Sequence, residues 1–100
     1  MIIYSITFAI DESIEKDWIQ YMKSTHIPAL MSGGYFTEFQ HTKIIPEQGL
    51  DLAFNIQLTC QNIDILTLYL NEKKDIDEKE LHQKYSGKFA SFFTKLEKIN

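Results

Sequence analysis

The chain has 100 residues and a formal net charge of −4, and it contains neither arginine nor valine. This length suits a single domain, residues 1–100, and an acidic chain without guanidinium groups is poorly suited to nucleic acid. The one cysteine, Cys60, excludes an internal disulfide and fits a reducing compartment. No run approaches the roughly 18 apolar residues of a membrane span, so we expect a soluble, cytoplasmic protein that contacts no membrane.

The first ten residues alternate in hydrophobicity with a period of two, which predicts a strand over residues 1–10. Its even positions are large and apolar: Ile2, Tyr4, Ile6, Phe8 and Ile10. Asp11 or Ser13 is then suited to cap a helix, and apolar side chains at three- and four-residue steps predict that helix over residues 13–32. Its expected buried stripe consists of Ile14, Trp18, Tyr21, Met22, Thr25 and Ala29.

Two features shape the end of this helix. Pro28 lacks an amide donor and its ring clashes with the carbonyl group of Ser24, so we expect the helix to bend or restart there. Gly33 and Gly34 follow, and we expect one of them to end the helix in a left-handed conformation.

Two strands are expected next, over residues 35–45 and 50–60, with a turn at residues 46–49 between them. The second of these strands has the cleaner alternation. One face carries Leu50, Leu52, Phe54, Ile56, Leu58 and Cys60, and the other carries Asp51, Ala53, Asn55, Gln57 and Thr59. Cys60 is therefore expected to pack as a small hydrophobic side chain.

The remaining residues predict a second helix and a last strand. Asn62 is suited to cap a helix over residues 62–86, and Asp77 with Glu80 forms a capping-box pattern that predicts a break around residues 75–77. Gly87 is expected to end this helix, and a strand follows over residues 88–98.

The order strand–helix–strand–strand–helix–strand predicts the ferredoxin-like α+β fold. This fold has one four-stranded antiparallel sheet, here in the spatial order fourth–first–third–second, with both helices on one face. The open face is half apolar, because Ile3, Ala9 and Ala53 lie on it among small polar residues. Such a face favours association, so we expect a homodimer through it, with Phe39 and Phe93 in the interface.

Several segments resemble a small bacterial family that is catalogued as a domain of unknown function. The resemblance covers essentially the whole chain and rests on Met-Ile-Ile-Tyr at residues 1–4, Trp18, Met22, His-Ile-Pro at residues 26–28 and Tyr-Ser-Gly-Lys-Phe at residues 85–89. That family is similar in turn to the dimeric α+β barrel superfamily, in which two ferredoxin-like subunits pack their open faces around a central cavity. Because superfamily members include small monooxygenases, isomerases and non-catalytic proteins, the resemblance implies the fold and the dimer but no single activity.

His26 is the candidate for chemistry, because an imidazole titrates near neutrality. We expect any ligand site to lie between the end of the first helix and the sheet, with His26 at its edge as a general base or hydrogen-bond donor and with Tyr4 and Trp18 as its walls. The competing interpretation is structural: His26 is a partly exposed residue that caps the helix end, and Trp18 belongs to the core together with Tyr21 and Met22.

The other histidines are scattered: His41 is expected to be exposed or at an interface, and His82 to be solvated. Because this spacing does not suit a metal site, we expect no metal and no cofactor. Two functions remain open. One is a non-catalytic homodimer that is either packed throughout or binds a small apolar molecule in the barrel. The other is a cofactor-independent enzyme of the small monooxygenase or isomerase kind, which would use His26 and polar groups of the barrel interior such as Asn55 and Gln57.

Overall fold

The computed structural model describes residues 1–47 and 52–100. Its elements follow the predicted order, with the helical segments divided into shorter pieces. In chain order they are β1 (Ile2–Ile10), a 3-10 turn (Glu12–Ile14), α1 (Glu15–Tyr21), a π turn (Met22–His26), α2 (Ile27–Ser32), β2 (Glu38–Lys43), β3 (Ala53–Cys60), α3 (Ile63–Glu72), α4 (Lys74–Tyr85) and β4 (Phe89–Glu97). Within these residues no helix combines the length and the apolarity needed to cross a bilayer.

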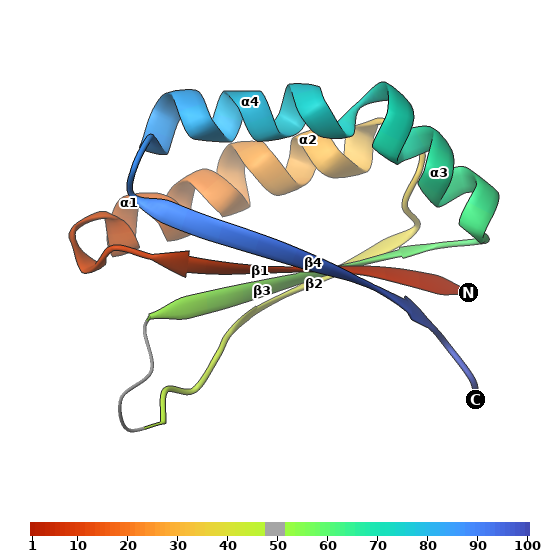
Figure 1. Ribbon diagram of the computed structural model, residues 1–100, viewed down its shortest axis with the longest axis horizontal. Coiled ribbons are helices and arrows are strands. Elements are labelled where there is room, and N and C mark those ends of the chain that lie inside the picture. Colours follow the sequence, from red (N-terminus) through yellow and green to blue (C-terminus); the bar gives the residue numbers. More distant parts are fainter. Residues whose placement is uncertain (48–51) are drawn as a thin grey trace.

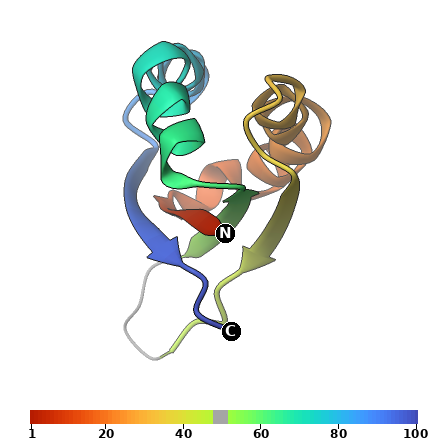
Figure 2. The same ribbon diagram turned by 90° about the vertical axis from the view of Figure 1, so that its right-hand side faces the viewer.

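The four strands form one sheet in the order β2-β3-β1-β4, and all neighbouring strands are antiparallel. This arrangement confirms the ferredoxin-like α+β fold and the expected strand order. Both helical segments cover the same face of the sheet (Figure 1). Seen from one end, β2 and β4 descend on either side of β1 and β3, so the open face is concave (Figure 2).

The strand bounds agree with the prediction to within one residue at β1 and β4, whereas β3 begins at Ala53 instead of residue 50 and β2 differs most. The prediction began this strand at residue 35, but Tyr35 and Phe36 precede it and turn toward the helices. Phe36 is buried, with its ring centroid 4.9 Å from that of Tyr69. The strand begins late because this aromatic pair is taken up by the core. Residues 48 and 49 of the predicted turn at residues 46–49, and residues 50 and 51 of the following strand, lie outside the described residues.

The first helical segment continues past Pro28, and one of its turns, just before the proline, is wider than a regular α-helical turn. In the π turn, the amide of Ile27 donates to the carbonyl group of Met22, five residues earlier. We attribute this wider turn to Pro28, which has no amide to donate and whose ring needs space against the preceding turn.

The π turn also changes which residues the first helix buries. A regular α-helix has 3.6 residues per turn, so side chains spaced four residues apart move gradually around the helix axis. The π turn has more residues per turn, and it therefore keeps such side chains on one side of the helix. The buried residues are Trp18, Met22, His26, Ile27 and Leu30. The predicted stripe was therefore wrong at Thr25, which is exposed, and at Ala29, which is half-buried.

The second helix is broken at Lys73, whose φ of −128° and ψ of −25° separate α3 from α4. The cap at Asn62 is confirmed, because its Oδ1 accepts from the amide of Ile65 at 3.0 Å. The predicted break at residues 75–77 was wrong. Asp77 lies inside α4 and is buried, and its carboxylate accepts a hydrogen bond from the hydroxyl of Tyr69 instead of capping a helix. Gly87 follows α4 with a φ of +75°, as expected for a helix end.

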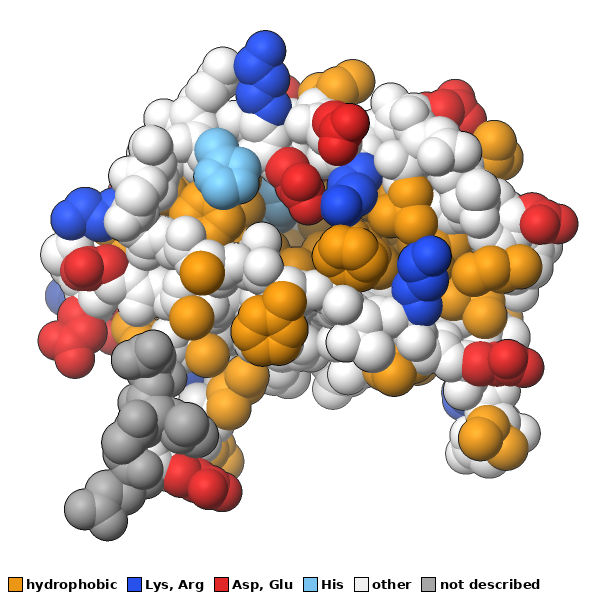
Figure 3. Space-filling model, in the orientation of Figure 1, with side chains coloured by type: hydrophobic (Ala, Val, Ile, Leu, Met, Phe, Trp, Pro, Cys, Tyr) orange, Lys and Arg blue, Asp and Glu red, His pale blue; other side chains and the backbone are white. Residues whose placement is uncertain are grey.

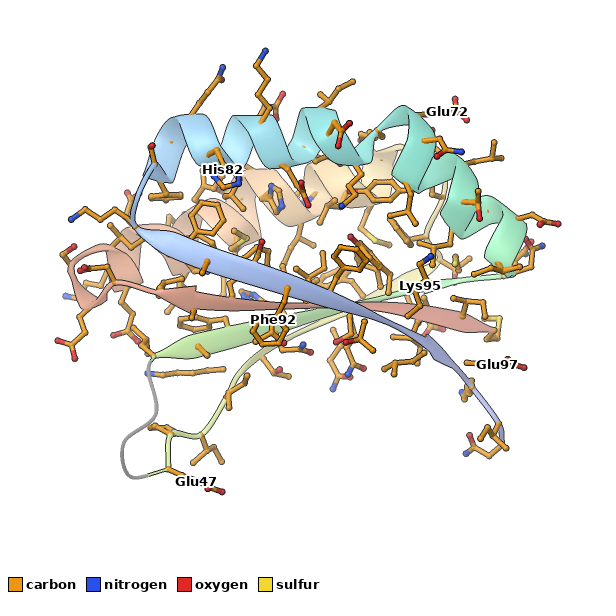
Figure 4. The ribbon with its side chains drawn as sticks, viewed as in Figure 1. Glu47, Glu72, His82, Phe92, Lys95 and Glu97 are labelled. Carbon is orange, nitrogen blue, oxygen red and sulfur yellow. The ribbon has the colours of Figure 1, made fainter. Side chains whose placement is uncertain are left out.

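The register of the strands assigns each side chain to one face of the sheet. The covered face carries the buried side chains of the two central strands: Tyr4, Phe8, Ile10, Phe54, Ile56, Leu58 and Cys60. Phe39 pairs with Leu58 and Phe93 pairs with Ile6, so both belong to this covered face. Their predicted place on the open face was wrong. The apolar side chains that β4 presents on the open face are Ala90, Phe92 and Leu96, and Phe92 points away from the helices (Figure 4).

Candidate functional site

A narrow cavity of about 20 Å³ lies between α4 and the sheet, and it has room for little more than one water molecule. Its apolar wall is formed by Tyr4, Ile6, Phe8, Leu30, Leu81 and Phe89. The polar side chains around it are His26, Tyr69, Lys74, Asp77, Glu78, His82 and Ser91. In the space-filling view it lies in the recess between α4 and β4, with one histidine at the surface and part of another deeper inside (Figure 3).

His26 reaches this cavity because the π turn places it on the buried side of the helix. Only 6% of the residue is exposed. Burial lowers its pKa to about 4, Lys73 acts in the same direction and Glu80 acts against it. The imidazole is therefore neutral at pH 7. It offers one donor and one acceptor nitrogen, so the interpretation of His26 as a partly exposed helix cap was wrong.

Two tyrosines and a buried carboxylate form the polar part of the cavity wall. The hydroxyl of Tyr69 donates to Oδ2 of Asp77 at 2.9 Å. Burial, together with the nearby carboxylates, raises the pKa values of Tyr69 and Tyr4, so both hydroxyls keep their protons. The hydroxyl of Tyr4, unlike that of Tyr69, has no hydrogen-bond partner among the described residues. Tyr4 and His26 therefore supply hydrogen-bonding groups that the protein itself does not use.

The rim of the cavity is closed by contacts between α4 and β4. The Nζ of Lys74 lies 4.4 Å from the ring centroid of Phe93 and 3.6 Å from Oε1 of Glu78. His82 stacks on Phe89, with ring centroids 4.7 Å apart, and points from α4 toward β4 (Figure 4). The charged lining consists of one cation, Lys74, and two acids, Asp77 and Glu78, so the rim favours neutral or cationic ligands over anionic ones.

The residues that the sequence suggested for a site lie in three different places. Tyr4 and His26 both line the cavity. Trp18 is fully buried in the core, where its ring lies 5.1 Å from that of Phe8 and 5.3 Å from that of Tyr85. Asn55 and Gln57 lie on the open face, on the other side of the sheet. The structure thus brings Tyr4 and His26 together and separates the other three from them.

Asn55 has a clear local role on the open face. Its Nδ2 lies 3.0 Å from Oγ of Ser5, 3.1 Å from Oγ1 of Thr7 and 3.3 Å from the carbonyl oxygen of Ile6. These contacts tie β3 to β1 and occupy the two amide hydrogens of the side chain. Of the side-chain amide of Asn55, only Oδ1 is left for a ligand or a partner.

The contribution of α4 to the cavity was not among the expectations from the sequence. A usable signal was present: Tyr69, Lys73, Asp77, Leu81 and Tyr85 follow one another at steps of four residues. This spacing places Asp77 in the same row as buried aromatic and aliphatic side chains.

Among the described residues, no group of three or more His, Cys, Asp or Glu side chains is arranged to hold a metal ion. Cys60 is buried as predicted, and burial raises the pKa of its thiol.

Residues 1–99 match a family model described as "Domain of unknown function (DUF4286)". No curated protein matches the chain. A protein from Bacillus halodurans described as an "ethyl tert-butyl ether d (ethd) family protein" is similar in structure, with a TM-score of 0.74 at 10% identity, over 99% of this chain and 100% of that one.

Two further solved structures are similar at comparable levels. A mutant of SnoaB from Streptomyces nogalater, described as a cofactor-independent oxygenase, has a TM-score of 0.65 at 9% identity, over 99% of this chain and 93% of that one. A dimeric ferredoxin-like protein of unknown function from Thermobifida fusca has a TM-score of 0.64 at 12% identity, over 96% of this chain and 90% of that one. At these identities the likeness establishes the shared fold alone.

Proposed function

Given that the chain belongs to the DUF4286 family, we propose that it is a non-catalytic homodimer in which each subunit binds a small, neutral, mostly apolar molecule between α4 and the sheet. The observation that carries this proposal is the pairing of His26 with Tyr4 in one cavity. Both side chains are buried and uncharged at pH 7, and both face an apolar wall. A neutral ligand with one hydroxyl or carbonyl group would satisfy them without bringing a charge into the cavity.

The size of the cavity means that the ligand enters only if a wall moves, because organic ligands need roughly 300 Å³ or more. The movable wall is α4. It buries only Asp77, Leu81 and Tyr85, and hydrogen bonds hold two of these in place: Tyr69 to Asp77 at 2.9 Å and Tyr85 to Asp17 at 2.5 Å. Non-helical residues flank it at both ends, Lys73 and Gly87. Small shifts at these joints would lift α4 from β4 and widen the cavity.

The homodimer part of the proposal rests on the open face. Phe92 and Leu96 remain 62% and 39% exposed on it. A hollow of about 490 Å³ on the same face is lined in part by Ile3, the partner of Leu96 in the sheet, and by Glu38, Gln40, Gln57 and Thr59. The polar groups at the centre are already hydrogen-bonded around Asn55, so burying them against a second copy costs little. The relative from Thermobifida fusca is described as dimeric. We expect an interface of at least about 1,200 Å².

Catalysis by His26 is the second candidate, and SnoaB, described as an oxygenase, shares the fold. The pKa of His26 argues against it. A general base works best with a pKa near the working pH, and a histidine with a pKa of about 4 is a weak base. The same low pKa suits a neutral hydrogen-bonding residue. Binding is therefore the better supported function of this cavity.

The proposal is tested on protein purified from its natural host by native mass spectrometry. We expect twice the chain mass of 11.7 kDa, with an added small molecule that a His26→Gln variant fails to retain. Lys16→Gln is the control, because Lys16 is an exposed residue of α1 outside this cavity. A monomer would overturn the dimer. A dimer without added mass, which also fails to bind 2-naphthol as a neutral probe, would overturn the ligand site.

A further inference from the structure

A second concave region lies at the opposite edge of the sheet, between the first helix and the edge strand β2. Its volume is about 340 Å³, and it is lined by Lys23, Ile27, Pro28, Phe39 and His41. We call it the β2 groove. A shallower hollow of about 190 Å³ adjoins it and shares Lys23 and His41 with it. None of the five groove residues lines the cavity under α4. Since the groove lies on the helix side of the sheet, a dimer through the open face leaves it accessible.

The β2 groove has the size and the apolar lining of a small-molecule site. Phe39 is 53% exposed, so a large aromatic side chain stands in the groove with little cover. Ile27 and Pro28 form the opposite wall, where the π turn meets α2. π turns occur frequently at functional sites, and here the widened turn gives the groove its helix-side wall. A ligand that covered Pro28 and Phe39, which are both exposed, would remove their apolar surface from water, whereas Ile27 is already buried.

The charge in the groove has one sign. Lys23 is its only charged lining residue, and its ammonium group forms no ion pair with any other described residue. The nearby Lys43 differs, because its Nζ lies 2.8 Å from Oε2 of Glu15. The chain has a net charge of −4, and here an ammonium group without an ion-pair partner among the described residues stands beside an apolar groove. It complements a ligand that carries one negative charge.

His41 adds a hydrogen-bonding group to the same place. Its Nε2 is covered by protein and has no hydrogen-bond partner in the described residues. A buried nitrogen without a partner is costly, so rotation of the ring toward a polar ligand in the groove would be favourable. Burial and the nearby Lys23 lower the pKa of His41, which leaves Lys23 as the charged group that an anion would meet.

We propose that the β2 groove binds a small aromatic or branched aliphatic carboxylic acid. The hydrocarbon part lies against Ile27, Pro28 and Phe39, the carboxylate pairs with the ammonium group of Lys23, and the ring of His41 donates or accepts a hydrogen bond. This ligand differs in charge from the neutral molecule proposed for the cavity under α4, whose rim carries two acids and one lysine. The two sites are therefore independent.

The test is a titration of the ¹⁵N-labelled full chain with phenylacetate, followed by amide chemical shifts, with phenylacetamide as the neutral match. We expect shifts at residues 23–28 and 39–41, and an affinity for phenylacetate at least about fivefold above that for phenylacetamide. Lys23→Gln should reduce the phenylacetate affinity to the phenylacetamide level. Lys16→Gln is the matched control, because Lys16 is an exposed lysine of α1 outside the groove, and it should leave the affinity unchanged.

Three results would overturn this inference: equal affinities for the acid and the amide, equal effects of Lys23→Gln and Lys16→Gln, or no shifts in the groove at about 20 mM phenylacetate. His41→Gln gives an independent reading, since glutamine keeps a donor and an acceptor, and we expect it to weaken binding less than Lys23→Gln does. Spectra with the dispersion of the unmodified chain show that each variant is folded. None of these results bears on the cavity under α4, which is tested through His26.

Discussion

The two faces of the sheet are built by the same strands but have different physical characters. On the covered face, the two central strands carry large side chains that are mostly buried, and aromatic contacts run from Tyr4 to Phe36 and from Phe8 to Trp18. The open face consists of small polar residues that bond to one another around Asn55, with exposed apolar side chains along β4. The difference indicates that the covered face holds the subunit together and contains the cavity, whereas the open face is suited to join subunits.

The largest effect is expected at the centre of the covered face. Trp18 is fully buried between Phe8, Tyr85 and Phe89. Trp18→Ala removes these contacts and leaves a void, so we expect the free energy of unfolding to fall by about 3–5 kcal/mol. Urea unfolding followed by circular dichroism measures this change. A loss below about 1 kcal/mol would show that the covered face is not the main source of stability.

The second effect is a pH dependence that originates at His26. Its pKa is about 4 in the folded chain, against an ordinary value of 6.5. Between these two pH values the unfolded chain binds more protons than the folded chain, so stability increases with pH over this range. We expect a loss of about 3 kcal/mol as the pH falls from 6.5 to 4, and no contribution from this residue above pH 7.

Urea unfolding at a series of pH values measures this dependence. Other groups also titrate over this range, so the comparison with His26→Gln isolates the contribution of one residue. The variant should have a shallower dependence between pH 6.5 and 4. Parallel curves for the two proteins would show that His26 is solvated in the folded state.

The third effect concerns the hydrogen bonds that hold α4 over the cavity. Tyr69→Phe removes the donor to the buried carboxylate of Asp77, and we expect a loss of about 2 kcal/mol. Tyr85→Phe removes the donor to Asp17, whose side chain is 65% exposed, so water replaces the bond and the expected loss is under about 1 kcal/mol. Amide hydrogen exchange of residues 74–85 should accelerate more in Tyr69→Phe, and the opposite order would contradict α4 as the movable wall.

The smallest effect on the stability of a subunit, but the most visible effect on assembly, is expected on the open face. Phe92→Lys adds a charge where the proposed dimer interface lies, and we expect the dimer to weaken at least about tenfold while subunit stability changes by less than about 0.5 kcal/mol. Phe93→Lys is the matched control, since the neighbouring residue lies on the covered face. Analytical ultracentrifugation should show dissociation in Phe92→Lys only. Dissociation of both variants would contradict a dimer interface that is confined to the open face.

The sequence by itself determined the elements whose evidence is local. Over residues 4–10 and 53–60 the large apolar side chains all fall at even positions, so β1 and β3 each have one face suited to the core. Asn62 can serve as a cap without any distant partner, and Gly87 takes a positive φ that other residues disfavour. These local signals were sufficient for the order of strands and helices, and hence for the ferredoxin-like fold.

Only the tertiary structure decided what depends on pairing between distant segments. The segments around Phe39 and Phe93 carry aromatic or apolar residues at both odd and even positions. The sequence therefore does not tell which of these side chains face the helices, and the pairs Phe39–Leu58 and Phe93–Ile6 decide it. A shift of one residue in either pairing would have reversed it.

The same holds for the candidate site. His26 is buried because a π turn replaces the regular helical repeat before Pro28. Asp77 tethers α4, instead of capping a helix, because Tyr69 approaches it from α3. Both outcomes depend on how distant segments pack against one another. A helical period of 3.6 residues and a capping pattern are local and carry no information about that packing.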